Sequence, residues 1–244
     1  VKPSKRYTIT TWPSINLEDS NYNGSHVTIL YVHGWSQTGN DSRLDDLKDA
    51  ILHNMDANVI LVDWGTTAHI PYPQAVSNTR IVSAQILRLW KHLTKKKGAD
   101  KLKLNRDDAT FVEVIHTNGR PTLPLLGLGI YQRLGDVDFY FNGGWDQPGC
   151  TNDENLHLRV FCPHVRSLLY YVEALKNPDC KFWGIKRSQS RTILSILSGG
   201  WLSRYLVSLR KCKIDTCIPV GLDSIKYPAR GAFDVATSNS VPYC

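Results

Sequence analysis

Runs of β-type residues alternate with helical segments along the first hundred residues of the chain. Val27–Val32 and Asn58–Trp64 are continuous runs of branched and aromatic residues, which are typical of strands buried on both faces. Leu44–Met55 and Asn78–Thr94 are the helical segments that follow them. Strands that alternate with helices favour a parallel sheet covered on both faces. The sequence therefore predicts an α/β fold.

The second half of the chain continues with strand and helix signals. Phe111–His116 and Val137–Phe141 are β-type runs, and a glycine turn signal follows each of them. Apolar residues at helical spacing over Val165–Leu175 predict an amphipathic helix. Two shorter strands are expected at Tyr7–Thr10 and Phe182–Ile185. No repeat or low-complexity linker divides these segments, so we expect one domain over residues 1–244.

Cysteine usage favours a secreted, extracellular protein. Six cysteines lie in the C-terminal part, and an even, clustered count is typical of disulfides, although six reduced thiols in a cytosolic protein are the alternative. Glycosylation sequons begin at Asn23 and Asn40. The chain begins at Val1, as expected after removal of a signal peptide. No run approaches 18 apolar residues, so no transmembrane segment is expected.

A net charge of +7 includes one basic cluster: Lys95, Lys96, Lys97, Lys101, Lys103 and Arg106. The cluster could attract an anionic lipid surface, a sulfated glycan or an acidic protein, or it could be a solvated loop. No zinc-type spacing, P-loop or dinucleotide fingerprint occurs in the sequence. We therefore expect no metal, no cofactor and no nucleic-acid partner.

Several motifs follow one another along nearly the whole chain. They are YVHGW at Tyr31–Trp35, VDWG at Val62–Gly65, SNTRIVSAQI at Ser77–Ile86, and then DATFVEVIHTNG, GDVDFYFNGGWDQPGC, CPHVRS and RGAFDVATSNSVPY. In this order they closely resemble the animal neutral lipase family. That family includes pancreatic-type lipases, wasp-venom phospholipases A1 and insect yolk proteins. The resemblance implies an α/β-hydrolase-like fold, with a parallel sheet flanked by helices.

The resemblance also implies roles for two residues. Trp35 matches the residue whose backbone N–H donates to the oxyanion hole, a large catalytic contribution in such enzymes. A glycine turn capped by a packed tryptophan is the alternative reading. His164 matches the catalytic histidine through CPHVRS. It would be a general base if a nucleophile lay within reach, and otherwise a remnant or a cap for the helix that follows it.

The segment that should carry the nucleophile is missing. In the family, a strand, the elbow GHSLG, a long helix and a strand ending in GLDPA follow the helix that here ends near Lys97. This chain instead passes through residues 98–106 almost directly to DATFVEV, which omits on the order of 45 residues, and no G-x-S-x-G occurs. Ser198 and Asp223 follow His164, whereas this fold supplies Ser, Asp and His in that order. We find no nucleophile and no acid.

Loss of a central strand and helix would open a gap in the sheet and expose apolar faces. Two explanations remain open at this stage. In one, the chain is a natural deletion variant whose neighbouring strands close the gap or pair with another chain in an oligomer. In the other, the real molecule contains a segment, near residues 97–104, that this sequence omits.

Only 11 residues separate Cys150 from Cys162, which resembles the short lid of the phospholipase A1 and yolk-protein branches. The resemblance implies the pairs Cys150–Cys162, Cys212–Cys217 and Cys180–Cys244, and no C-terminal β-sandwich domain. A short lid would leave an apolar groove partly open. Its lining candidates, which could equally be ordinary loop packing, are Leu123, Leu125, Leu126, Leu128, Trp145 and Phe161.

These observations lead to a first functional hypothesis. The chain is expected to be a secreted, catalytically inactive lipase-like protein that binds lipid or another apolar ligand, or serves as a yolk-type storage protein. The alternative is an active carboxylic ester hydrolase of the phospholipase A1 or lipase type, with a Ser and an Asp from outside this sequence, His164 as base and Trp35 in the oxyanion hole. A third reading is an interaction protein that uses the basic cluster.

Overall fold

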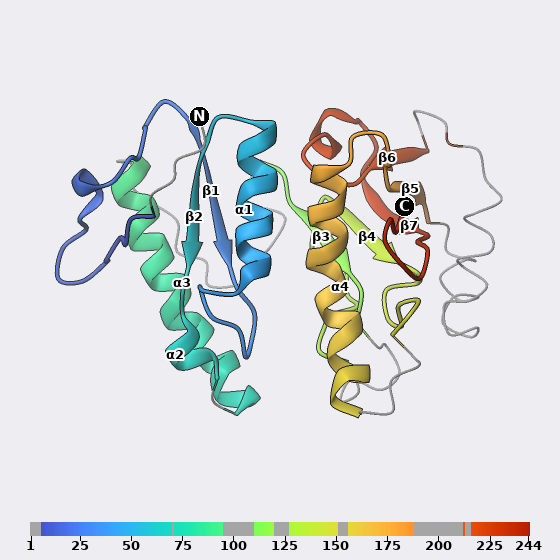
Figure 1. Cartoon of the computed structure of the whole chain (residues 1–244), viewed down its shortest axis with the longest axis horizontal. Helices are drawn as coiled ribbons and strands as arrows, with labels where there is room; N and C mark the ends of the chain where they lie inside the picture. The colour runs from blue at the N-terminus through green and yellow to red at the C-terminus, as the bar shows by residue number, and fades with distance from the viewer. Residues whose placement is uncertain are drawn as a thin grey trace. The chain divides into compact units, whose positions relative to one another are not determined.

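The structure is a computed structural model that describes residues 6–69, 71–94, 110–119, 127–150, 156–187, 212 and 216–244. The chain forms two compact units, Val1–Lys103 and Leu104–Cys244 (Figure 1). Each unit is described by itself below. The single domain expected over the whole chain stays a prediction.

The first unit is built around a parallel pair of strands. Its elements are η1 (Leu17–Asp19), β1 (Val27–Val32), α1 (Ser42–Asn54), β2 (Ala57–Val62), α2 (Gly65–Ala68) and α3 (Tyr72–Thr94). β1 and β2 pair in parallel from Val27 opposite Ala57 to Val32 opposite Val62. Helix α1 connects them and begins where the Asp41 side chain accepts the backbone N–H of Arg43 at 3.0 Å. The predicted alternation of strands and helices is confirmed here.

β1 and β2 are less buried than their sequences predict. Val27 and Val32 are 57% and 42% exposed, and the residues between them are only half-buried. The expectation of burial on both faces is therefore wrong for these strands. Among the described residues the sheet has two strands, so each strand has another strand on one side only. Burial on both faces needs covering layers that a two-stranded sheet is too narrow to support.

In the described part of the second unit the strands form one five-stranded sheet. Its elements are β3 (Glu113–His116), β4 (Val137–Phe141), α4 (Leu156–Lys176), β5 (Trp183–Lys186), β6 (Cys217–Pro219), η3 (Ser224–Lys226) and β7 (Gly231–Val235). The strand order is β3-β4-β7-β5-β6. β3, β4 and β7 run parallel, whereas β5 is antiparallel to both β7 and β6. The sheet is thus mixed rather than purely parallel.

Aromatic side chains from β4, β7 and α4 form the core of the second unit. The rings of Phe139 and Phe233 lie 5.9 Å apart, and Phe141 stacks on Tyr170 at 4.8 Å. Gly184 on β5 permits this packing, because a Cβ there would lie 2.5 Å from Cε1 of Phe139. All four aromatic residues are fully buried. This core holds β4 and β7 rigidly at the centre of the sheet.

Further expectations from the sequence concern a strand at Tyr7–Thr10, the basic cluster and membrane-spanning segments. Tyr7–Thr10 is not a strand, because no neighbouring strand pairs with it among the described residues. The chain around residue 97–104 and the basic cluster lie outside the described residues, so the role proposed for its lysines (Lys95, Lys96, Lys97, Lys101 and Lys103) stays a prediction. In the part of the chain that the structure describes, no helix has the length and apolar character needed to cross a membrane.

Candidate functional site

A buried histidine organises the loops that follow β1 and β2. The backbone N–H of Trp64 donates to Nε2 of His33 at 3.0 Å, and the Trp64 indole donates to the His33 carbonyl at 2.6 Å. Nδ1 of His33 lies 2.9 Å from the carbonyl of Gly34. Because Nε2 accepts from Trp64, the proton of the neutral ring belongs on Nδ1, where it is donated to Gly34. The two loops are therefore tied together at the carboxyl ends of both strands.

Asp63, at the end of β2, completes this arrangement. Its Oδ1 accepts the backbone N–H of Gly65 at 2.9 Å and lies 3.1 Å from Nε2 of His33. Hydrogen bonds from the backbone N–H groups of Gly65 and Gly39 hold the pKa of Asp63 below its ordinary value. Gly39 is needed here, since a Cβ at that position would lie 2.7 Å from the Asp63 Cβ. The carboxylate is thus fixed in its charged form.

Trp35 lies on the tight turn that this network supports. Its half-buried ring packs edge-on against Tyr72 at 5.4 Å. The next residue, Ser36, has a φ of 60° and donates its N–H to the Ala68 carbonyl at 3.0 Å. The N–H of Gly34 donates to Oε1 of Gln37 at 2.7 Å. The turn is well supported, while the role of the Trp35 N–H in an oxyanion hole stays a prediction.

His164 lies inside helix α4, not at its entrance. The helix begins at Leu156 and contains Pro163, so the expected position of His164 as a cap before the helix is wrong. The sequence predicted the helix only over Val165–Leu175, whereas α4 begins at Leu156 and continues through Pro163. Within the helix, the Ser167 hydroxyl donates to the His164 carbonyl at 2.9 Å. His164 is therefore held on a regular helical turn.

The His164 imidazole is half-buried and lacks a carboxylate partner within the described part of the chain. Burial lowers its pKa below the ordinary histidine value. In a catalytic triad the pKa of the histidine is raised instead, because the acid stabilises the protonated ring. Trp35 belongs to the first unit and His164 to the second, so their meeting in one site stays a prediction.

We expect His164 to titrate below the ordinary histidine pKa of about 6.5. The Cε1–H resonance measured by NMR across a pH series, and assigned by its loss in His164→Gln, gives the midpoint. A midpoint above the ordinary value would mean that a carboxylate contacts the ring, as in an intact triad. In that case the structural account of His164 would be wrong.

The lid region is fixed by a disulfide between Cys150 and Cys162. Cys162 lies within α4, so the second part of the lid is helical. Trp145 is buried and stacks on Tyr131, on the segment before β4, at 5.8 Å; this contact favours the alternative of ordinary loop packing, and a groove lined by Trp145 stays a prediction. Phe161 and Leu128 are half-buried, while Leu123, Leu125 and Leu126 lie outside the described residues.

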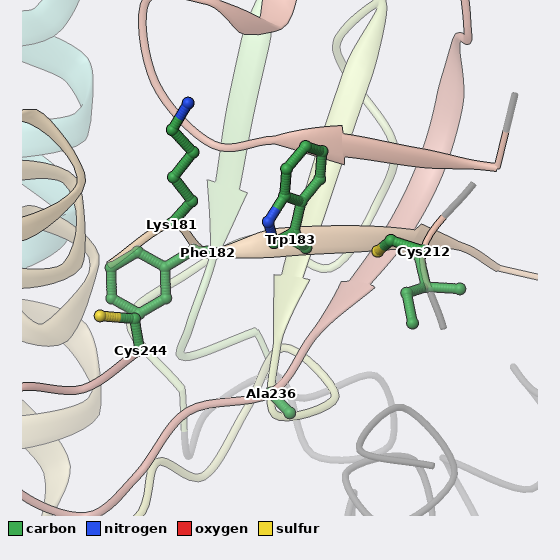
Figure 2. Close-up of a pocket in the computed structure, with 7 residues that line it drawn as sticks. Lys181, Phe182, Trp183, Cys212, Ala236 and Cys244 are labelled. Atoms are coloured by element: carbon green, nitrogen blue, oxygen red, sulfur yellow. The ribbon is translucent and has the colours of Figure 1, made fainter. Parts of the chain in front are cut away.

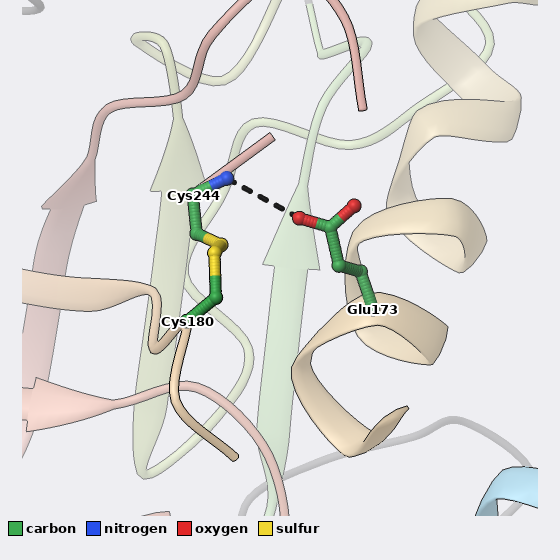
Figure 3. A group of neighbouring side chains, drawn as sticks. All are labelled: Glu173, Cys180 and Cys244. Carbon is green, nitrogen blue, oxygen red and sulfur yellow. Dashed lines mark hydrogen bonds between the residues drawn. A yellow bond between two sulfur atoms is a disulfide. The ribbon is translucent and has the colours of Figure 1, made fainter. Parts of the chain in front are cut away.

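The other two disulfides are Cys180–Cys244 and Cys212–Cys217, the same pairs that the family resemblance implies. Glu173 lies beside the first of them, and its Oε1 accepts the N–H groups of Tyr243 at 2.6 Å and Cys244 at 3.2 Å (Figure 3). One ligand atom each from Glu173, Cys180 and Cys244 would lie within 4.8 Å of one another. Metal binding needs thiolates, however, and both sulfurs are bonded to each other.

The sequence reasoning missed two buried ion pairs beside β3, β4 and β7. Nε2 of His116 lies 3.0 Å from Oδ1 of Asp138, and Nδ1 lies 2.6 Å from the Ile130 carbonyl. Arg187 donates through Nε to Asp234 at 2.7 Å. Charged residues inside otherwise apolar strands, such as Asp138 in VDFYF, were the available signal, since a buried charge requires a partner. Both imidazole nitrogens of His116 are satisfied, so the pair holds the loop rather than facing a substrate.

The second unit also has a pocket of about 330 Å³ beside β5 (Figure 2). Its volume lies near the lower limit for small-molecule sites. Its lining residues are Lys181, Phe182, Trp183, Ile185, Cys212, Ala236 and Cys244. Lys181 is the one charged residue among them, and both cysteines are in disulfides. The described lining residues therefore supply no serine, threonine or free thiol as a nucleophile.

Asn23 and Asn40 are exposed, as glycosylation would require. Their modification stays a prediction.

A lipase family model, described simply as "Lipase", matches residues 2–101 and 95–194. The chain belongs to the lipase family. Phospholipase A1 4 of Polistes dominula is 27% identical over 90% of this chain and 79% of its own length. Inactive pancreatic lipase-related protein 1 of Homo sapiens is 27% identical over 67% of this chain and 47% of its own length. Pancreatic triacylglycerol lipase of Myocastor coypus is 27% identical over 78% of the chain and 54% of its own.

The alignment with one relative includes positions that this chain lacks. The alignment with phospholipase A1 4 runs over 280 positions, more than the 244 residues of this chain, so some positions have no counterpart here. The lipase family model matches in two parts that meet at residues 95–101. The overlap of the two matches lies between α3 and β3, where the sequence predicts the missing segment, and that placement stays a prediction. The chain spans about half the length of the two pancreatic relatives.

Proposed function

We propose that this chain is a secreted lipase-family protein that does not hydrolyse esters and that binds lipid or another apolar ligand, or serves as a storage protein. The absence of G-x-S-x-G from the sequence carries the proposal. A serine becomes a nucleophile in this fold only on the strained turn between a strand and a helix, where its hydroxyl is exposed and the next N–H completes the oxyanion hole. A serine elsewhere lacks both features.

Two further observations support inactivity. The His164 imidazole has no carboxylate partner among the described residues, so nothing there raises its basicity. Loss of activity also occurs among the relatives, since one of them is named an inactive pancreatic lipase-related protein. The disulfide at the lid and the supported turn at Trp35 would preserve the fold after loss of the chemistry.

The second candidate is an ester hydrolase of the phospholipase A1 or lipase type. The tied loops around His33 and Trp35 favour it, because they supply the turn that an oxyanion hole requires. This reading requires a Ser and an Asp from a segment between α3 and β3 that the sequence omits. An intact mass of the natural protein well above 27.6 kDa plus glycans would support it.

We expect no serine-dependent turnover from the purified chain. Hydrolysis of p-nitrophenyl butyrate and of phosphatidylcholine should be the same for the wild type and for His164→Ala, and a fluorophosphonate probe should label neither. In a working triad the loss of His164 would lower turnover by about 10³-fold or more, so the assay clearly distinguishes an active triad from an inactive chain. A labelled serine, with turnover that disappears in His164→Ala, would overturn the proposal.

A further inference from the structure

Helix α3 presents a stripe of large apolar side chains to solvent in the first unit. Tyr72, Val76 and Trp90 are each close to half exposed, with Val76 at 49%. At about 100° per residue these positions fall within roughly 40° of one another around the helix axis. The half-buried Leu87 extends the same stripe. The core-facing side of α3 is different, because it carries the buried residues Ala75 and Leu89.

Basic residues lie beside this stripe, and α3 contains no Asp or Glu. Arg80 and Lys91 are exposed and lie next to it on the helix surface. Arg88 is directed to the preceding segment, where Nη2 donates to the Pro13 carbonyl at 3.1 Å and the guanidinium lies 5.6 Å from the ring of Trp12. Trp12 is itself highly exposed. This part of the first unit therefore combines exposed tryptophans with positive charge.

Four acidic residues of the first unit lie on α1 or at its start, and Glu18 and Asp19 lie on η1. Helix α1 carries Asp45, Asp46 and Asp49, and Asp41 caps its start. In the view of Figure 1, α1 and α3 lie on either side of the β1–β2 pair. A solvated helix normally pairs its Lys and Arg with acidic residues one turn away. On α3 the absence of such partners leaves the positive charge available to an external anion.

We propose that this surface (Tyr72, Val76, Arg80, Leu87, Trp90 and Lys91; the α3 face) binds an anionic lipid surface. Aromatic and aliphatic side chains enter the boundary between headgroups and acyl chains, while adjacent Lys and Arg side chains contact the anionic headgroups. Charge complementarity selects a negatively charged surface over a neutral one. The inference goes beyond the proposed ligand binding, because it concerns attachment to a lipid surface and holds whether or not the chain hydrolyses esters.

The test compares two double variants of the full chain in a vesicle co-sedimentation assay. Val76→Ser with Lys91→Gln removes one aliphatic side chain and one cation from the α3 face. Ile225→Ser with Lys226→Gln makes the same kind of change in the second unit, where Ile225 is 48% exposed, close to the 49% of Val76. Both variants have the same net charge, and both alter exposed side chains, so folding should be preserved.

Wild type should bind vesicles that contain phosphatidylserine and should bind pure phosphatidylcholine vesicles much more weakly. One cation contributes about a five-fold change in partition to such a surface, so the α3 variant should lose about five-fold or more. The Ile225/Lys226 variant should stay close to wild type. Equal losses in both variants, or no binding by wild type, would overturn the proposal. A dimer that becomes monomeric only in the α3 variant would make this face a subunit interface instead.

Discussion

Arg187→Ala should lower the free energy of unfolding of the full chain by about 3–5 kcal/mol in urea denaturation. The Arg187 side chain is 4% exposed and its partner Asp234 is 1% exposed. Arg187 also donates to the Tyr131 hydroxyl at 2.9 Å, and its guanidinium lies 4.0 Å from the ring of Tyr140. Oδ2 of Asp234 already has no hydrogen-bond partner. Removal of Arg187 would leave a buried carboxylate without any compensating charge.

Two controls separate this effect from a general loss of charge. Lys226→Ala breaks an exposed pair with Asp223, so it should lower the free energy of unfolding far less than Arg187→Ala does. Arg187→Met combined with Asp234→Leu removes both charges, so it should recover much of the stability that Arg187→Ala loses. A cost for Arg187→Ala as small as that of Lys226→Ala would contradict the buried pair.

Glu113→Gln should stabilise the protein above neutral pH, by up to about 3 kcal/mol. Burial raises the pKa of Glu113 to about 7, although hydrogen bonds from Ser224 and the Gly221 N–H oppose the shift. Its Oε1 is fully buried without a hydrogen-bond partner. Burial raises the pKa of the neighbouring Tyr171, and the Glu113 charge adds to that shift. Among the described residues no cation pairs with Glu113, so ionisation of this carboxyl is costly.

The sign of the pH dependence follows from the raised pKa. The unfolded chain loses this proton near pH 4.5, whereas the folded chain retains it until about pH 7. The contribution of Glu113 to stability is therefore complete below about pH 4.5 and is lost as the pH rises through about 7. Urea denaturation of wild type and Glu113→Gln at a series of pH values should give curves that diverge over this interval. Parallel curves would show that the carboxyl is solvated.

The sequence predicted the elements whose hydrophobic pattern is strong and local. β4 (Val137–Phe141) begins and ends where its β-type run does, and α1 begins within two residues of the expected helix. β7 was missed, although it lies between β4 and β5 in the sheet and contains the β-type run Ala232–Val235. Its five residues begin at Gly231 (φ 119°), and a strand this short is stabilised by its neighbours rather than by its own pattern.

For the candidate site too, the sequence predicted positions along the chain but not the contacts between distant residues. The positions of Trp35 and His164 along the chain came from motifs, but the interior position of His164 in α4 did not, because the apolar pattern predicted the helix only from Val165 onward. The His33 network and the His116–Asp138 pair join residues 30 and 22 positions apart. Contacts at such separations depend on strand register, which no local pattern specifies.

The sequence by itself determined membership of the lipase family, the α/β alternation and the absence of a nucleophile elbow, since each depends on residue types in a short order along the chain. Only the tertiary structure decided that the strands divide into a two-stranded and a five-stranded sheet, and that Glu113 and Asp234 are buried while the α3 face is exposed. Burial is the reason. Burial depends on which distant segments cover a side chain. A carboxyl becomes a pH-sensitive group because it is buried, and an apolar stripe becomes a candidate binding surface because it is left exposed.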